Sequence, residues 1–205
     1  MPSQITLYNE DCLPAMRKMK DKQFDLALVD PPYGIDAANN AHSNLKNLGD
    51  KHWDNKCPNW EYFLELKRVS KNQIIWGGNY FSLPRCRGFI FWDKHPMPPS
   101  YAVGEYAWTS FDINAKKWNG KTGNETAVSN RIHPTQKPVR LYQWLLKNYA
   151  KSGDKILDTH LGSGSIAIAC HDMGYDLTGY EIDKDYYDAA VKRLENHKKQ
   201  GQLFI

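Results

Sequence analysis

The stretch KILDTHLGSGSIA, residues 155–167, decides the fold of this chain. A short apolar run leads into a glycine-rich turn and then into a helical pattern, and the next strand-like run, 176–181, ends in Glu181. This order is typical of a nucleotide-binding βαβ unit. Gly162 permits the tight turn, Gly164 lets a ligand approach the backbone, and the carboxylate after the second strand accepts hydrogen bonds from ribose hydroxyls. The alternative is a tight strand-to-helix turn followed by a surface glutamate.

The position of this unit in the chain restricts the fold further. Only 24 residues follow Glu181, which is enough for one helix, so the remaining strands come from the N-terminal half. The nucleotide unit is therefore last in the sequence but central in the sheet, and we expect a circularly permuted topology. Because this unit comes first in dinucleotide-binding domains, and because the chain has no second domain for a substrate, the order argues against an NAD-dependent enzyme.

Hydrophobic periodicity outside this unit predicts alternating strands and helices. Strands are expected at 4–8, 24–29, 72–77, 88–92, 155–159 and 176–181. Helices are expected after Asp11, at 59–70, from Pro138 to Gly153, from the glycine-rich turn to Gly174, and at 184–197. The predicted fold class is α/β, with a doubly wound, mostly parallel sheet and helices on both faces.

The positions of apolar residues predict the buried face of two of these helices. Two other segments show no clear hydrophobic periodicity. The helix at 59–70 is expected to bury Trp60, Phe63, Leu64 and Val69. The helix after Pro138 is expected to bury Leu141, Tyr142, Leu145 and Tyr149. Residues 34–57 read as a long loop, and residues 94–132 read as irregular.

Composition is that of a soluble globular protein with one domain, residues 1–205. Hydrophobic residues make up 41% of the chain and charged residues 24%, and there is no run of 18 apolar residues and no secretory signal. The four cysteines are scattered, without a C-x-x-C pair, and the histidines show no zinc spacing. We therefore expect reduced thiols, no metal, no membrane and a cytoplasmic location.

The positive charge is concentrated in the middle of the chain. Residues 83–140 carry nine Lys or Arg against four Asp or Glu, a net charge of +5, whereas the rest of the chain has a net charge of −1. The same segment contains aromatic residues: Trp92, Tyr106, Trp108, Phe111 and Trp118. A basic segment interleaved with aromatics suits a polyanion with flat bases, and the alternative is a solvated loop region over a partly exposed core.

The tetrapeptide Asp30-Pro31-Pro32-Tyr33 directly follows the apolar run 24–29. In a doubly wound sheet the carboxyl ends of the strands form the ligand crevice, so Asp30 belongs beside the glycine-rich turn. A carboxylate and the rigid Pro31 carbonyl could accept both N–H bonds of an exocyclic amine and turn its lone pair toward an electrophile. Tyr33 offers a flat face for an extruded base. The alternative is a strand-ending turn with a buried tyrosine.

Three motifs together make the chain resemble the β-class amino-methyltransferases of DNA. They are DPPY at 30–33, HPTQKP at 133–138 and DTHLGSGS at 158–165, and the resemblance covers nearly the whole chain. It implies a permuted, Rossmann-like methyltransferase fold, S-adenosylmethionine as the cofactor, and a base flipped out of duplex DNA as the substrate. It also implies nucleoid association in a prokaryotic or phage-infected cell.

The same resemblance implies roles for individual residues. The target amine would be held by Asp30, Pro31, Pro32 and Tyr33. Cofactor contacts would come from Asp11, Cys12, Asp30, His133, Thr135, Lys137, Asp158, His160, Gly162, Ser163, Gly164 and Glu181. Within this set, Glu181 would bind the ribose, Asp11 and Cys12 the adenine, and the HPTQKP residues the methionine end.

Two positions need comment: His160, where the chain departs from the family pattern, and Asp30, which bears on the choice of target base. The usual loop begins Asp-Pro-Phe, whereas this chain has His160 in place of the Phe. His160 could stack near the target or cofactor, or it could be an ordinary satisfied polar residue. Family members that methylate cytosine N4 usually carry Ser at the position of Asp30, so the resemblance favours adenine N6 over cytosine N4. A non-catalytic nucleic-acid-binding module is a further alternative.

The resemblance implies that target recognition lies within 94–132 and that 34–57 forms a mobile loop over the active site. Candidate phosphate or base contacts are Arg85, Arg87, Lys94, Lys116, Lys117, Lys121 and Arg131. The sequence leaves open whether the chain forms a homodimer and whether a cognate restriction endonuclease accompanies it.

Overall fold

The computed structural model describes residues 3–35, 54–94, 102–120 and 131–202. Most of the segment 34–57 and parts of the segment 94–132, including Lys121, lie outside the described residues. The described strands form one eight-stranded sheet in the order β1-β8-β7-β2-β3-β5-β4-β6. Within the described residues, none of the helices is long and apolar enough to cross a bilayer.

The sheet is mostly parallel. Its strands are β1 (Ile5–Tyr8), β2 (Phe24–Val29), β3 (Ser70–Trp76), β4 (Phe89–Asp93), β5 (Gly104–Thr109), β6 (Lys116–Trp118), β7 (Lys155–Asp158) and β8 (Asp176–Tyr180). Strands β1, β8, β7, β2 and β3 run parallel to one another, β5 runs antiparallel to β3 and β4, and β6 runs parallel to β4. Because the late strands β7 and β8 lie between the early strands β1 and β2, the predicted permuted α/β fold is confirmed.

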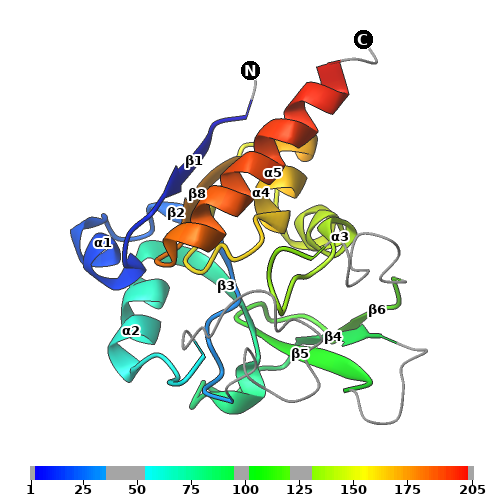
Figure 1. Cartoon of the computed structure of the whole chain (residues 1–205). Helices are drawn as coiled ribbons and strands as arrows, with labels where there is room; N and C mark the ends of the chain where they lie inside the picture. The colour runs from blue at the N-terminus through cyan, green and yellow to red at the C-terminus, as the bar shows by residue number, and fades with distance from the viewer. Residues whose placement is uncertain (1–2, 36–53, 95–101, 121–130, 203–205) are drawn as a thin grey trace.

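Helices cover both faces of the sheet (Figure 1). They are α1 (Cys12–Lys18), α2 (Trp60–Val69), α3 (Val139–Tyr149), α4 (Ser165–Met173) and α5 (Lys184–Gln202), with a 3-10 turn, η2 (Gly78–Tyr80). The alternation of side chains along β2 separates two cores. Leu26 and Leu28 belong to the core under α3, α4 and α5, whereas Ala27 and Val29 belong to the core under α1 and α2.

Two predictions about local structure are wrong. The residues of α2 that face the core are Tyr62, Leu66 and Val69, whereas Trp60 is 74% exposed and Leu64 is 54% exposed. The helix carries apolar residues on more than one side, so periodicity alone chose the wrong stripe. The segment 94–132 is also less irregular than predicted, because it contributes β5 and β6 to the sheet. The buried face predicted for α3 is confirmed.

The turn before α4 brings that helix against α5. Gly164 caps α4 with φ of +70°, and a Cβ built there would lie 3.0 Å from the Cβ of Ala190 in α5. The structure thus shows a reason for glycine at position 164, the close approach of α5, that the sequence did not indicate, and the cofactor role of Gly164 stays a prediction. Gly174 ends the same helix with φ of +77°, and nothing lies within 4 Å of a Cβ built there.

We expect Gly164→Ala to lower the free energy of unfolding more than Gly174→Ala. Both variants place an alanine at positive φ, which costs about 1–2 kcal/mol. Only the first also forces α4 and α5 apart, which adds roughly 1 kcal/mol or more. Urea denaturation of both variants measures the difference. Equal losses, or no energetic coupling between Gly164→Ala and Ala190→Gly, would contradict the helix-contact explanation.

Candidate active site

Three carboxylates follow adjacent parallel strands at one edge of the sheet. Asp30 comes after β2, Asp158 ends β7 and Glu181 comes after β8. Since parallel strands place their carboxyl ends at the same edge, residues 151 positions apart in the sequence lie close together. Two adjoining cavities open along this edge, and Asp30, Pro32 and Thr135 line both of them.

The first cavity, called here the glycine-loop cavity, has a volume of about 310 Å³. It lies between the turn after β7, the turn after β8 and the segment before α3. Its lining residues are Asp30, Pro32, His133, Thr135, Gln136, Lys137, Tyr142, His160, Leu161, Gly162, Ser163, Glu181, Ile182 and Tyr186. This volume is within the range of cavities that bind small ligands.

Backbone N–H groups hold the carboxylate of Glu181 in the glycine-loop cavity. Oε2 accepts from Gly162 N at 2.8 Å, and Oε1 accepts from Asp183 N at 2.9 Å. Each oxygen keeps a second lone pair, so the carboxylate can still accept hydrogen bonds from a vicinal diol. The loop itself is anchored from α5, because the Arg193 guanidinium donates to the Ser163 carbonyl and to Ser165 Oγ, both at 2.8 Å. These features fit the ribose of a nucleoside cofactor.

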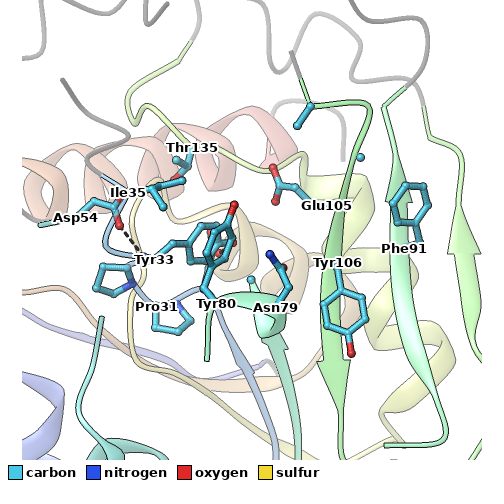
Figure 2. Close-up of a pocket in the computed structure, with 15 residues that line it drawn as sticks. Pro31, Tyr33, Ile35, Asp54, Asn79, Tyr80, Phe91, Glu105, Tyr106 and Thr135 are labelled. Atoms are coloured by element: carbon cyan, nitrogen blue, oxygen red, sulfur yellow. Dashed lines mark hydrogen bonds between the residues drawn. The ribbon is translucent and has the colours of Figure 1, made fainter. Parts of the chain in front are cut away.

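The second cavity, called here the tyrosine cavity, has a volume of about 350 Å³ and is shown in Figure 2. The rings of Tyr33 and Tyr80 stack in it, with centroids 4.9 Å apart and planes inclined by 12°. Asp54 fixes the Tyr33 turn by accepting from Tyr33 N at 2.5 Å and Gly34 N at 2.9 Å. The remaining lining residues are Asp30, Pro31, Pro32, Ile35, Gly77, Asn79, Phe91, Ala102, Gly104, Glu105, Tyr106 and Thr135.

A buried ion cluster connects the two cavities. The ammonium of Lys137 lies 2.5 Å from Asp30 Oδ2 and 3.1 Å from Glu105 Oε2, and 5.1 Å from the centroid of the Trp76 ring. Lys94 pairs with the other oxygen of Glu105. The cluster therefore balances two carboxylates with two ammonium groups, which offsets the cost of removing four charges from water.

The hydroxyl of Tyr33 supplies a further contact to this cluster, because it donates to Asp30 Oδ1 at 2.5 Å. Burial raises the pKa of Asp30 above its ordinary value, while the contact with Lys137 opposes that rise. The pKa of Glu105 is lowered to about 2. Burial alone would raise it, but the charges and hydrogen bonds of Lys137 and Lys94 outweigh the effect of burial. The same carboxylates raise the pKa of Lys137.

Two other buried groups have strongly shifted pKa values. Burial, together with the charges of Asp30 and Glu181, raises the pKa of Asp158 to about 8, so this side chain is a neutral acid at pH 7. Burial and the nearby Lys137 lower the pKa of His133 to about 3, so its imidazole is neutral. Within the described residues, no group of three His, Cys, Asp or Glu side chains is arranged to hold a metal ion.

The structure brings most of the residues expected at the site together, but not all. Asp158 and Gly164 do not line the glycine-loop cavity, and neither do Asp11 and Cys12. Asp11 caps α1 by accepting from Leu13 N at 2.9 Å, and Cys12 is buried beside it. Asp158 lies beneath the loop and accepts from His160 N at 3.0 Å. Asp11 and Asp158 thus make structural hydrogen bonds next to the cavity, and the cofactor role of all four residues stays a prediction.

Sequence reasoning missed the residues that β5 and η2 contribute. Glu105 and Tyr106 lie in the segment read as irregular, and Tyr80 lies in a turn that has no motif. The alternation in GEYAWT, residues 104–109, was the signal that could have revealed β5. The basic residues also have internal partners: Lys94 pairs with Glu105, Arg87 with Asp112, and Lys117 with Asp93.

The chain matches a family model described as DNA methylase over residues 75–192, more than half of its length. Among curated proteins it is similar to the type II methyltransferase M2.DpnII of Streptococcus pneumoniae, with 24% identity over 94% of this chain and 90% of that protein. It is also similar to the type II methyltransferase M.ScaI of Streptomyces caespitosus, with 23% identity over 94% of this chain and 82% of that protein.

Solved structures share the fold. An M1.HpyAVI–SAM complex matches with a TM-score of 0.64 and 22% identity, covering 93% of this chain and all of that one. PvuII DNA methyltransferase, which is cytosine-N4-specific, matches with a TM-score of 0.64 and 14% identity, covering 97% of this chain and 92% of that one. Fold similarity of this degree therefore extends to an enzyme specific for cytosine, so the fold by itself does not identify the base.

We expect Asp158→Asn to stabilise the fold more at pH 8 than at pH 5. The unfolded Asp titrates near 3.8 and the folded one at about 8, so between these values the folded chain binds the extra proton and stability falls as pH rises. Asparagine removes this dependence and keeps the oxygen that accepts from His160 N. The gain at pH 8 relative to pH 5 should be on the order of a few kcal/mol.

Urea denaturation of wild type and variant at both pH values measures this gain. Asp25→Asn is the matched control, because the pKa of Asp25 is lowered from 3.8 and its removal should have the same effect at pH 5 and pH 8. A pH-independent effect of Asp158→Asn would show that Asp158 is ionised in the folded protein.

Proposed function

The chain belongs to the DNA methylase family, and on that premise we propose that it transfers the methyl group of S-adenosylmethionine to the N6 amine of adenine in DNA. The observation that carries this proposal is the position of Asp30. Its carboxylate lies where the glycine-loop cavity and the tyrosine cavity meet, so it can contact a group held between a cofactor and a base.

S-adenosylmethionine supplies an electrophilic methyl group on a sulfonium centre and fits the glycine-loop cavity. Glu181, fixed by two backbone N–H groups, accepts hydrogen bonds from the two ribose hydroxyls. Gly162 exposes backbone beside them, with the ring of His133 opposite. Thr135 lies at the junction with the tyrosine cavity, where the methyl group has to meet its acceptor.

The tyrosine cavity receives the adenine after it has been flipped out of the duplex. Its aromatic lining, which includes Tyr33 and Tyr80, suits a flat base. One N–H of the N6 amine donates to the Asp30 carboxylate and the other to the Pro31 carbonyl. Both bonds draw the nitrogen lone pair out of conjugation with the ring and direct it toward the methyl group. The cofactor would supply the methyl group and be left as S-adenosylhomocysteine, and the methylated amine, held by Asp30 and the Pro31 carbonyl, would release one proton to solvent.

Tyr33 and Lys137 orient Asp30 for this role. The hydroxyl of Tyr33 uses one lone pair of Oδ1, and the ammonium of Lys137 uses one lone pair of Oδ2. An ionised carboxylate has about four acceptor directions, so two remain for the amine. Methyl transfer moves positive charge from the sulfur to the amine nitrogen. The negative carboxylate therefore stabilises the amine as it becomes positive.

Adenine is the proposed base because position 30 carries Asp, whereas the similar cytosine-N4 enzymes usually carry Ser there. The relatives M2.DpnII and M.ScaI are type II methyltransferases, which supports a place in restriction–modification for this chain as well. Its substrate is then chromosomal or phage DNA in the cytoplasm of a prokaryotic cell.

Wild-type protein incubated with labelled S-adenosylmethionine and unmethylated DNA should produce N6-methyladenine in a nucleoside digest. Asp30→Asn keeps the shape of the side chain but removes the charge, so kcat should fall by about 10² or more. The Kd for S-adenosylhomocysteine, measured by calorimetry, should stay within about twofold. Recovery of N4-methylcytosine in place of N6-methyladenine would move the assignment to cytosine, and full activity of Asp30→Asn would refute the role of the carboxylate.

We also expect kcat/KM to fall as pH decreases through the pKa of Asp30, because only the ionised carboxylate accepts the amine. Burial raises that pKa, so the acid limb should lie above 3.8. Tyr33→Phe removes a hydrogen bond that favours the ionised form, and it should shift the acid limb to higher pH and lower kcat by about tenfold.

Tyr80→Phe is the matched control for this pH experiment. It keeps an aromatic ring stacked on Tyr33 and removes a hydroxyl that makes no hydrogen bond to Asp30. Its acid limb should coincide with that of wild type. If Tyr33→Phe and Tyr80→Phe give the same pH profile, the Tyr33 hydroxyl does not act through Asp30.

A further inference from the structure

Three side chains behind the glycine-loop cavity form a hydrogen-bonded chain. The hydroxyl of Tyr62, in α2, lies 2.6 Å from Oγ1 of Thr159, which in turn lies 2.9 Å from Nδ1 of His160. Tyr62 and Thr159 are each only 3% exposed. Both distances are those of good hydrogen bonds. The partners available to each atom therefore decide which group donates and which accepts in this hydrogen-bonded series.

The hydroxyl proton of Tyr62 determines which atoms donate and which accept in these hydrogen bonds. Among the described residues its hydroxyl is bonded to Thr159 Oγ1 and to no other atom. If Thr159 donated to Tyr62, the phenol hydrogen would be buried without an acceptor, at a cost of about 1–3 kcal/mol. Tyr62 therefore donates to Thr159, and the hydrogen of Thr159 is directed at His160 Nδ1.

A histidine that accepts at Nδ1 carries its proton on Nε2 when it is neutral. Burial lowers the pKa of His160 to about 4, which keeps the imidazole neutral at pH 7. The ring is further held against Tyr62 in an edge-on contact, with centroids 5.4 Å apart. The hydrogen-bonded chain thus fixes both the tautomer and the orientation of the ring.

His160 lines the glycine-loop cavity, and Nε2 is the ring nitrogen that its contact with Thr159 leaves over. Nε2 has no hydrogen-bond partner among residues 3–35, 54–94, 102–120 and 131–202. Among the described residues Nε2 is not one of the polar atoms that are both fully buried and without a partner, so this nitrogen is not completely enclosed by protein. The hydrogen bond at Nδ1 fixes the ring, and Nε2–H is left without a partner among the described residues. Such a preorganised donor can bind an acceptor atom of a ligand.

We propose that His160 donates a hydrogen bond from Nε2–H to an oxygen or ring-nitrogen acceptor of the bound cofactor. This inference rests on the proposed function, because it takes the ligand of the glycine-loop cavity to be S-adenosylmethionine. In this chain a neutral hydrogen-bond donor replaces the aromatic hydrocarbon that similar loops carry at this position. Thr159 and Tyr62 are positioning residues that hold the donor in place.

Calorimetric titration with S-adenosylhomocysteine at pH 7 tests the donor. His160→Phe removes it while keeping an aromatic ring, and the Kd should rise about tenfold. His160→Gln is the matched variant, because its side-chain amide places an N–H near the position of Nε2, and its Kd should stay within about threefold of wild type. Thermal denaturation of both variants reports whether they fold, and the Gln variant still tests the donor if the Phe variant does not fold.

Imidazole ¹H–¹⁵N correlation spectra test the tautomer without any ligand. The His160 signals are those that disappear in His160→Phe, and they should show a proton on Nε2 and an acceptor Nδ1. Thr159→Val keeps the shape of the threonine and removes the hydroxyl, so the His160 signals should shift toward a mixture of tautomers, while the Kd rises severalfold.

The possible outcomes separate the two proposals. An Nε2–H tautomer with weaker binding in His160→Phe and near-normal binding in His160→Gln supports the inference. An Nδ1–H tautomer, or equal affinity of the Phe variant, overturns it and leaves the proposed function intact, because wild type still binds S-adenosylhomocysteine. If wild type does not bind S-adenosylhomocysteine at all, the proposed function fails and the inference fails with it.

Discussion

The ammonium of Lys137 lies between two buried carboxylates, at 2.5 Å from Asp30 and 3.1 Å from Glu105. These three groups come from the turn after β2, from β5 and from the segment before α3, so one ion cluster fixes the relative position of three parts of the chain. Removing the lysine would leave two carboxylates buried without the cation that they share. The resulting loss of folding free energy would exceed the net stabilisation that the intact cluster provides. Both cavities have Asp30 in their walls, and their shared boundary therefore depends on this cluster.

The two cavities are built by different means. Hydrogen bonds to the backbone fix the loop side of the glycine-loop cavity: the N–H groups of Gly162 and Asp183 hold Glu181, and Arg193 holds the carbonyl of Ser163. Side chains from several elements define the tyrosine cavity, where Tyr33 stacks on Tyr80 and Asp54 fixes the turn.

Several features could be predicted because their signals are local in the sequence. The apolar runs and the residues that cap them give the strands and most helix boundaries, including Asp11 before α1 and Gly174 after α4. Errors arose where local signals were ambiguous. The helix α2 has apolar residues on more than one side, so Trp60 was expected to be buried and is exposed. In β5, the sequence gives no sign that a carboxylate at Glu105 is buried, because its cationic partners Lys94 and Lys137 lie outside the strand.

The sequence by itself determined the permuted position of the glycine-rich unit and the carboxylates at the strand ends. These features depend on the spacing of residues and on the edge at which parallel strands end. Only the tertiary structure decided that Lys137 neutralises Asp30 and Glu105, that Gly164 makes room for α5, and that Tyr62 and Thr159 orient His160. Such contacts join residues as far apart as positions 30 and 137, and hydrogen bonds and ion pairs between distant segments leave no periodic pattern in the sequence.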